Sequence, residues 1–458
     1  MISVIIPALN EENTIRSVIQ LAKRNELVSE IIVVDDQSKD QTVTESRKEG
    51  VRIITSTQLG KGHSMREGMM VAKNELLVFL DADIPNYQED IIHLLTEPLI
   101  NNEADFVKSY FERQAGRVTE LLVKPLFDIF FPQLNHFRQP LSGMIAGKKS
   151  FFQKVEFEND YGVDVGLLID MHQVKARIIE VNIGEVENDM QPLKALGRMA
   201  RQVANAIFKR VGMLSNLMPD GGETMAKNFN TQLDNALSVL QPQPKKIVVF
   251  DMDNTLLRGS FINTAAKKFG FSKALDKIVS EGNNDFVRTK KISRLLEGRH
   301  FAELIEVVES IPLIGDAVLV IRELQAKGYQ CGIISDSYHS ITNHVKNMLG
   351  LDFSLGNELE FKQSVATGEV KIPSQFIKES QSGCEHDYCK SNMFRYILDE
   401  FQVKPQQAVA VGDGLNDLCM IRMAGTGIAF NSPHHQLDHA ARYVLKSDSL
   451  MPVLGIVD

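Results

Sequence analysis

The sequence predicts two α/β domains within one chain of 458 residues. Short apolar runs that end in Asp, Asn, Ser or Gly recur in both halves and alternate with segments of helical period, as expected for buried parallel strands. This pattern stops after about residue 211 and restarts at Lys245. The length also exceeds the roughly 100–200 residues of a typical domain, which favours more than one core.

The elements follow from these patterns in order. A helix is predicted over Glu12–Lys23 by its period. The strands that the apolar runs predict are Ile2–Ile6, Ile31–Val34, Leu76–Leu80, Ile247–Phe250, Cys331–Ile334 and Ala408–Val411. Residues 214–244 hold Met-Pro-Asp-Gly-Gly and Gln-Pro-Gln-Pro, which are typical of a linker. We therefore expect domains at 1–213 and 245–458, joined by a linker at 214–244.

The composition excludes several classes of protein. Apolar residues make up 43% of the chain and charged residues 24%, so neither disorder nor a fibrous repeat is expected. The net charge is −9 and no basic patch is visible, which argues against nucleic acid and membrane surfaces as partners. No run approaches the ~20 apolar residues of a membrane span, and the first nine residues lack the features of a signal peptide. A cytoplasmic protein is expected, and the sequence leaves a homo-oligomer open.

The four cysteines, Cys331, Cys384, Cys389 and Cys419, are too few for a disulfide framework in a chain of this size. We expect free thiols in a reducing compartment. Cys384 and Cys389 have no second pair at zinc-finger spacing, which favours ordinary packing over metal binding.

Three polar clusters follow the apolar runs of the N-terminal half. They are Pro7-Ala8-Leu9-Asn10-Glu11-Glu12, Asp35-Asp36-Gln37-Ser38 and Asp81-Ala82-Asp83. Ligands of parallel sheets bind at the carboxyl ends of the strands. A diphosphate leaving group needs a divalent cation against its growing charge, and Asp-x-Asp offers carboxylates that suit Mg²⁺ or Mn²⁺. The clusters therefore offer candidate ligands for a divalent cation at the ends of these strands.

This ordered set, with Gly60-Lys61-Gly62 between its second and third clusters, resembles the nucleotide-diphospho-sugar transferase (GT-A-like) fold of family-two-like glycosyltransferases. Further segments resemble glucosyl-3-phosphoglycerate synthases, retaining enzymes that move glucose from a nucleotide diphosphate to 3-phosphoglycerate. These segments are Gly116–Leu121, Gln139–Gly143, Tyr161–Leu168 and Arg201–Val203. The resemblance covers residues 1 to about 212.

The resemblance implies roles for individual residues. Asp83 would bind the metal, and Arg117 with Thr119 would bind the acceptor phosphate, to which a guanidinium and a hydroxyl can both donate. The residues that would bind the nucleotide and the sugar are Pro7, Leu9, Asn10, Glu11, Asp36, Lys61, Asp81, Tyr161 and Asp164.

Four positions depart from the family. Val186, Asn188 and Met190 stand where the family has an Arg, a metal-binding His and an acceptor-binding Asn, and Met144 replaces an acid. Asn188 still offers an oxygen ligand to the metal, whereas a methionine makes no useful hydrogen bond to a carboxylate. The departures leave the identity of the acceptor open.

The C-terminal half begins with an apolar run that leads into Asp251-Met252-Asp253. Residues two apart on a strand face the same side, so both carboxylates can reach one ligand. Asp251 is the candidate nucleophile toward phosphorus, and Asp253 the candidate acid for the leaving alkoxide and base for water. Ser335 and Lys390 can donate to the phosphoryl oxygens, and Asp413 and Asp417 can bind Mg²⁺ together with Asp251.

This four-part set resembles the haloacid dehalogenase superfamily, nearest its phosphoserine-phosphatase branch, over residues 245–458. It implies a Rossmann-like fold with a helical cap at about 260–320, Asp253 as a further metal-site residue, and substrate contacts from Thr255, Lys291 and Asn416. Ser260 stands where phosphoserine phosphatases carry a glutamate for the substrate amine, which favours an anionic substrate without an amine.

Together the halves predict a bifunctional enzyme. The first would transfer glucose, with UDP-glucose favoured as donor, to 3-phosphoglycerate, and the second would remove the phosphate to give glucosylglycerate, a compatible solute. Two alternatives stay open. In the first, the two activities are the same, but the acceptor is glycerol phosphate or another polyol phosphate, or the transferred sugar is mannose. In the second, the first domain binds a nucleotide sugar without turnover and regulates the phosphatase.

Overall fold

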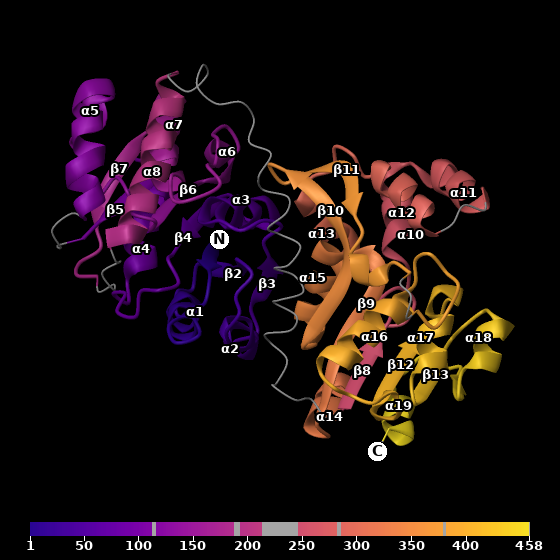
Figure 1. Ribbon diagram of the computed structural model, residues 1–458. Coiled ribbons are helices and arrows are strands. Elements are labelled where there is room, and N and C mark those ends of the chain that lie inside the picture. Colours follow the sequence, from indigo (N-terminus) through magenta and orange to yellow (C-terminus); the bar gives the residue numbers. More distant parts are fainter. Residues whose placement is uncertain (112–115, 187–192, 213–245, 282–284, 379–381, 458) are drawn as a thin grey trace. The chain divides into compact units, whose positions relative to one another are not determined.

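The computed structural model describes residues 1–111, 116–186, 193–212, 246–281, 285–378 and 382–457 (Figure 1). The predicted linker, 214–244, lies outside these ranges. The chain divides into two compact units, Met1–Met225 and Ala226–Asp458. Among the described residues, no helix has both the length and the apolar character needed to cross a membrane.

Unit 1 is built on a seven-stranded sheet of order β3-β2-β1-β4-β6-β5-β7. Its strands are β1 (Ile2–Ala8), β2 (Val28–Asp35), β3 (Arg52–Thr55), β4 (Leu76–Phe79), β5 (Phe106–Tyr110), β6 (Ile145–Lys148) and β7 (Ile178–Asn182). Only β6 runs antiparallel to its neighbours, β4 and β5. The carboxyl ends of β1, β2 and β4 therefore meet at one edge of the sheet, where the three polar clusters begin.

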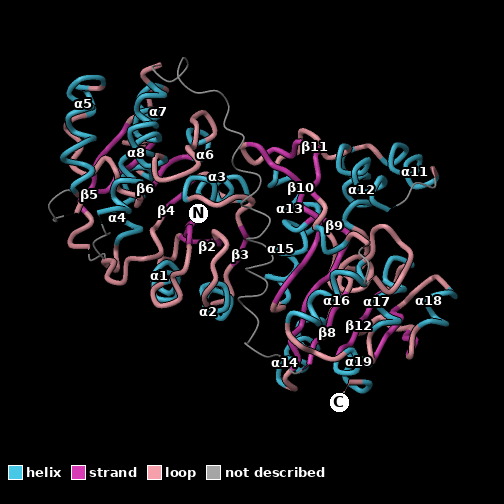
Figure 2. Tube along the Cα trace, viewed as in Figure 1, coloured by secondary structure: helices cyan, strands magenta, loops and turns pink. Residues whose placement is uncertain are grey.

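Helices cover this sheet, as the cyan segments of Figure 2 show. They are α1 (Ile15–Lys23), α2 (Thr42–Lys48), α3 (Lys61–Val71), α4 (Ile91–Ile100), η1 (Thr119–Val123), α5 (Lys124–Phe130), η2 (Pro132–Leu134), α6 (Lys149–Phe152), α7 (Val163–Gln173) and α8 (Leu193–Arg210). Helix α1 begins three residues later than predicted. The backbone amides of Glu11 and Glu12 donate instead to Thr42 Oγ1 and Asp40 Oδ2, at 2.7 and 3.0 Å.

Unit 2 holds a second seven-stranded sheet, of order β11-β10-β9-β8-β12-β13-β14. Its strands are β8 (Lys246–Phe250), β9 (Tyr329–Tyr338), β10 (Phe353–Lys362), β11 (Val365–Lys371), β12 (Ala408–Gly412), β13 (Thr426–Phe430) and β14 (Tyr443–Leu445). The strands pair in parallel except for the antiparallel hairpin of β10 and β11.

The segment expected as a cap is helical. It contains α10 (Phe261–Phe269), α11 (Ser272–Ser280), α12 (Asp285–Arg294) and α13 (Phe301–Glu309), and the β10–β11 hairpin packs against it through a hydrogen bond from Ser293 Oγ to the carbonyl of Gly368, 2.8 Å. The remaining helical elements are α14 (Ala317–Ala326), α15 (His339–Leu349), η3 (Ser374–Phe376), α16 (Lys390–Glu400), η4 (Pro405–Gln407), η5 (Leu415–Asp417), α17 (Leu418–Met423), α18 (His435–Ala440) and α19 (Met451–Ile456).

The α/β fold class is confirmed, and all six predicted strands exist. They form β1, β2, β4, β8, β9 and β12, although β4 ends at Phe79, one residue earlier than expected. Each of these six strands has a neighbouring strand on both sides, and most of their side chains are buried, which favours apolar residues. The sequence did not single out the edge strands β3, β7, β11 and β14, nor the interior strands β5, β6, β10 and β13.

Two candidate active sites

Lys61 is the centre of a partly buried ion cluster in unit 1. It is the first residue of α3, and its Nζ lies 2.8 Å from Asp81 Oδ1, which follows β4, and 3.2 Å from Asp164 Oδ2 on α7. Burial opposes the positive charge, but the Asp164 and Asp81 carboxylates outweigh it and raise the pKa of Lys61 above its ordinary value. Three segments distant in the sequence are thus joined at the expected edge of the sheet.

Asp164 keeps one oxygen available for a ligand. Its side chain is 2% exposed, and Oδ1 has no hydrogen-bond partner among the described residues. Burial raises the pKa of Asp164, an effect that the nearby Lys61 and Lys108 oppose. A buried carboxylate oxygen without a donor is costly, so a hydrogen-bond donor on a bound ligand would relieve this cost.

Lys108, which lies within β5, was not predicted from the sequence as a site residue. Its Nζ donates to the backbone carbonyls of Ser142 at 2.8 Å and of Asp164 at 3.0 Å. Burial lowers the pKa of Lys108 to about 8. One indication of its role was visible in the sequence, a lysine within the short strand-like run Phe106–Tyr110. A lysine in a buried strand requires polar partners, because a charged side chain is rarely buried without them.

Two further carboxyl groups predicted for this site, at the same edge of the sheet, have raised pKa values. The backbone amide of Gly60 donates to both oxygens of Asp36, at 3.0 and 2.9 Å, and burial raises the pKa of Asp36 to about 7. Burial, followed by the charge of Asp83, raises the pKa of Glu11 to about 7. The contribution of the Asp83 charge indicates that Glu11 lies close to Asp83, the predicted metal ligand. A cation bound there would relieve the repulsion between the two carboxylates.

The other predicted site residues of unit 1 differ in how far they are exposed. Leu9 and Tyr161 are 44% and 49% exposed, as a binding surface requires, and Asn10 adopts a left-handed φ of 60° while its Oδ1 accepts from the amide of Lys39. Pro7 is half-buried in β1.

The expected acceptor residues are only partly accessible. Arg117 is exposed, but Thr119 is buried at the start of η1. Met144 and Val186, two of the departures from the family, belong to the apolar core, so they fill volume and offer no polar contact. Asn188 and Met190 lie outside the described residues.

The centre of unit 2 is Lys390, the first residue of α16. Its Nζ lies 2.7 Å from Asp251 Oδ1 and 2.8 Å from Asp417 Oδ1, and the three side chains are at most 5% exposed. Burial and then the charge of Asp417 raise the pKa of Asp251 to about 7, although Lys390 opposes the shift. The lysine partly compensates two carboxylates that would otherwise repel each other.

The remaining carboxyls of this centre are suited to different tasks. Burial, then the charge of Asp251, raises the pKa of Asp253 to about 7, in the range useful to a general acid at neutral pH. Asp251, Asp413 and Asp417 each offer a carboxylate oxygen within 4.8 Å of the others, which suits a hard divalent cation. Asp253 is not part of this group, so its role as a metal ligand stays a prediction.

Of the other predicted residues of unit 2, Thr255, Ser335 and Asn416 lie near the Asp251–Lys390–Asp417 centre, whereas Lys291 forms an ion pair elsewhere. Thr255 is buried and donates to Asp413 at 3.3 Å, and Ser335 is buried near the carboxyl end of β9. Asn416 Nδ2 donates to Asp336 Oδ2 at 3.1 Å. Lys291 instead forms an ion pair with Glu281 within the helical segment, at 2.5 Å.

Asp336 is a second residue of the site that was not predicted from the sequence. Its charge contributes to the raised pKa values of both Asp251 and Asp253, so it lies close to the candidate nucleophile and the candidate acid. The motif Ile333–Ser337 held the signal, but only Ser335 was assigned a role.

Comparisons with known proteins match each half of the chain to an enzyme family. Residues 3–157 match the family described as Glycosyl transferase family 2, and residues 245–425 match haloacid dehalogenase-like hydrolase. The glucosyl-3-phosphoglycerate synthase of Mycobacterium tuberculosis is 34% identical over 248 residues, which cover 48% of this chain and 75% of that protein. A crystal structure of that protein with Mn²⁺, UDP-glucose and phosphoglyceric acid matches at 35% identity, with a TM-score of 0.45, over 48% of this chain and 81% of the other.

The phosphoserine phosphatase of Archaeoglobus fulgidus is 32% identical over 203 residues, which cover 42% of this chain and 56% of that protein. The resemblance of each half to an enzyme class is thus confirmed, for the glycosyltransferase half and for the phosphatase half. The chain belongs to the glucosyl-3-phosphoglycerate synthase family and carries, in the same polypeptide, a haloacid dehalogenase-like hydrolase domain.

Proposed function

We propose that the chain makes glucosylglycerate in two steps, transfer of glucose from UDP-glucose to 3-phosphoglycerate and hydrolysis of the resulting phosphate ester. The observation that carries this proposal is the union, in one chain, of a domain of the synthase family with a complete Asp251–Lys390–Asp417 centre. The product of the first domain would carry the phosphomonoester that the second domain hydrolyses.

In the transfer step, the bond from the anomeric carbon to the diphosphate breaks and a bond to the acceptor hydroxyl forms, while the hydroxyl proton is released. Asp164 Oδ1 would orient a sugar hydroxyl, and Lys61 would hold Asp164 and Asp81 in place. Asp36 and Glu11 would bind the nucleoside. A divalent cation, Mg²⁺ or Mn²⁺, held by Asp83 would supply charge against the departing diphosphate.

In the hydrolysis step, Asp251 would attack phosphorus while Asp253 gives its proton to the leaving alkoxide. Asp253 would then take a proton from water, which cleaves the aspartyl-phosphate and regenerates Asp251. Lys390 would neutralise phosphoryl oxygens beside the nucleophile. Mg²⁺, held by Asp251, Asp413 and Asp417, would let an anionic carboxylate approach an anionic phosphate.

A second acceptor is favoured by one observation. Met144 and Val186 are core residues here, so two polar contacts that the family offers are missing near the predicted acceptor site. Glycerol phosphate lacks a carboxylate and would need fewer of these contacts. The choice between the acceptors decides the product but changes neither chemistry.

The test is incubation of the full chain with UDP-glucose, Mg²⁺ and either 3-phosphoglycerate or glycerol phosphate. We expect glucosylglycerate and free phosphate from the first acceptor. Product from glycerol phosphate alone would support the second acceptor, and no UDP release with any acceptor would contradict both. Asp251→Asn should accumulate the phosphorylated glycoside, whereas Asp83→Ala should end its synthesis and leave its hydrolysis intact.

A further inference from the structure

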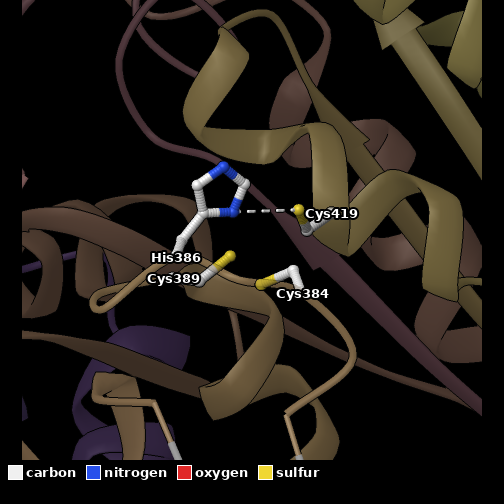
Figure 3. Close-up of side chains that lie close together, drawn as sticks. All are labelled: Cys384, His386, Cys389 and Cys419. Carbon is white, nitrogen blue, oxygen red and sulfur yellow. Dashed lines mark hydrogen bonds between the residues drawn. The ribbon is translucent and has the colours of Figure 1, made fainter.

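Four side chains with metal-binding atoms converge in unit 2, as Figure 3 shows. They are the thiols of Cys384, Cys389 and Cys419 and the imidazole of His386, and one ligand atom of each lies within 4.8 Å of the others. Cys384 and His386 precede α16, Cys389 immediately precedes its first residue, and Cys419 lies on α17. The phosphatase chemistry uses none of these four residues.

The separations fit a tetrahedral site for a soft metal. His386 Nδ1 lies 3.5 Å from Cys419 Sγ, the contact dashed in Figure 3. Bonds of about 2.3 Å to sulfur and about 2.0 Å to nitrogen at tetrahedral angles place sulfur about 3.5 Å from nitrogen, and two sulfurs about 3.8 Å apart. The observed cluster therefore needs a contraction of no more than about 1 Å to close on one ion.

We propose that Cys384, His386, Cys389 and Cys419 bind a structural Zn²⁺ ion. Three thiolates and an imidazole select a soft or borderline metal over Mg²⁺, and four protein ligands close the site against water, as in structural zinc sites. Ser391 Oγ lies 3.1 Å from Cys389 Sγ and 3.8 Å from Cys384 Sγ, where its hydroxyl can donate to a metal-bound sulfur.

The zinc would position the phosphatase residues. Cys389 is bonded in sequence to Lys390, and Cys419 lies two residues after Asp417. Lys390 Nζ and Asp417 Oδ1 are 2.8 Å apart in the centre. An ion shared by both cysteines fixes the start of α16 against α17, and with it the distance between the catalytic lysine and an aspartate of the predicted Mg²⁺ site.

Metal analysis of the full chain tests the proposal. The protein is purified without chelator under reducing conditions, and its zinc content is measured by inductively coupled plasma mass spectrometry. We expect about one zinc per chain in wild type, and its loss in Cys384→Ser and Cys419→Ser. The matched control is Cys331→Ser, because Cys331 is buried in β9 outside the cluster and should leave the zinc in place.

Cobalt distinguishes this site from the carboxylates of the centre. Co²⁺ added to metal-free wild type should give the near-ultraviolet thiolate charge-transfer band, and the cysteine variants should lack it. Loss of the ion should also lower the phosphatase kcat about 10- to 100-fold, since a shift of about 1 Å at a catalytic group has an effect of that size. Transfer of glucose should stay unchanged.

Three results would overturn the proposal. One is equal zinc in wild type and both cluster variants. Another is no zinc uptake by reduced, metal-free wild type in competition with a chromophoric chelator, a measurement that needs no variant to fold. The third is a disulfide between two of the cluster cysteines in protein kept under cytoplasm-like reducing conditions.

Discussion

Replacement of Lys390 by methionine isolates the electrostatic role of this residue, because methionine keeps most of its volume and removes its charge. Lys390 Nζ lies 2.7 Å from Asp251 and 2.8 Å from Asp417, and all three side chains are nearly inaccessible. Removal of one partner from a buried ion pair costs about 3–5 kcal/mol, because the remaining charge stays buried without compensation. A loss of 1 kcal/mol lowers Tm by about 2–4 °C in a domain of this size. The expected loss is therefore about 6–20 °C in Tm for unit 2.

Scanning calorimetry of the full chain measures this loss, and phosphate release from a supplied phosphorylated glycoside measures the accompanying loss of activity. The matched control is Lys268→Met, whose lysine pairs with Glu306 at 2.9 Å but is 40% exposed, so its removal should cost no more than about 1 kcal/mol. The double variant Lys390→Met with Asp417→Asn should recover part of the lost stability, since it removes one of the two stranded charges. A Tm loss no larger than that of the control would refute the reasoning.

Three further predictions address the rest of the molecule. Burial raises the pKa of Asp36 from 3.8 to about 7, so the carboxyl binds its proton more tightly in the native state than in the unfolded state. Wild type should therefore lose stability as the pH rises from about 4 to about 7, and Asp36→Asn should gain Tm relative to wild type between pH 5 and pH 8. Parallel curves of Tm against pH for the two proteins would contradict this. A Cβ on Gly143 would lie 2.5 and 2.6 Å from the Asp81 carboxylate oxygens, so Gly143→Ala should reduce glucose transfer at least about tenfold, whereas Gly197→Ala, in open space, should not. Removal of divalent cations by EDTA should end both transfer and phosphate release. Mg²⁺ alone should restore transfer, whereas full phosphate release should need Zn²⁺ as well, because EDTA also removes zinc. Activity that persists in EDTA would exclude the metal roles proposed here.

The sequence was most informative about the strands next to the two sites. Central strands of a parallel sheet are apolar throughout, so their ends could be located and the carboxylates after them, such as Asp81 and Asp251, assigned to sites. The short β6, which runs antiparallel, gave no such signal because its four residues include glycine and lysine. Lys108 was missed for a related reason, since a charge within a run conceals a strand.

Contacts between distant segments could not be predicted. The sequence showed Cys384 and Cys389 as an isolated pair, because nothing in local spacing indicates that the packing of α17 against α16 brings Cys419 to them. The same holds for Lys61 and Asp164, whose ion pair joins residues from α3 and α7. Local pattern locates the elements, whereas the tertiary fold determines which side chains meet.

The central claim is that one chain performs transfer and hydrolysis in sequence. Its most direct test is mass spectrometry of the products formed from UDP-glucose and 3-phosphoglycerate with Mg²⁺, together with the ratio of phosphate to UDP. The proposed function predicts glucosylglycerate and one phosphate for each UDP. Accumulation of the phosphorylated glycoside by the wild-type chain, or phosphate release without UDP, would contradict it.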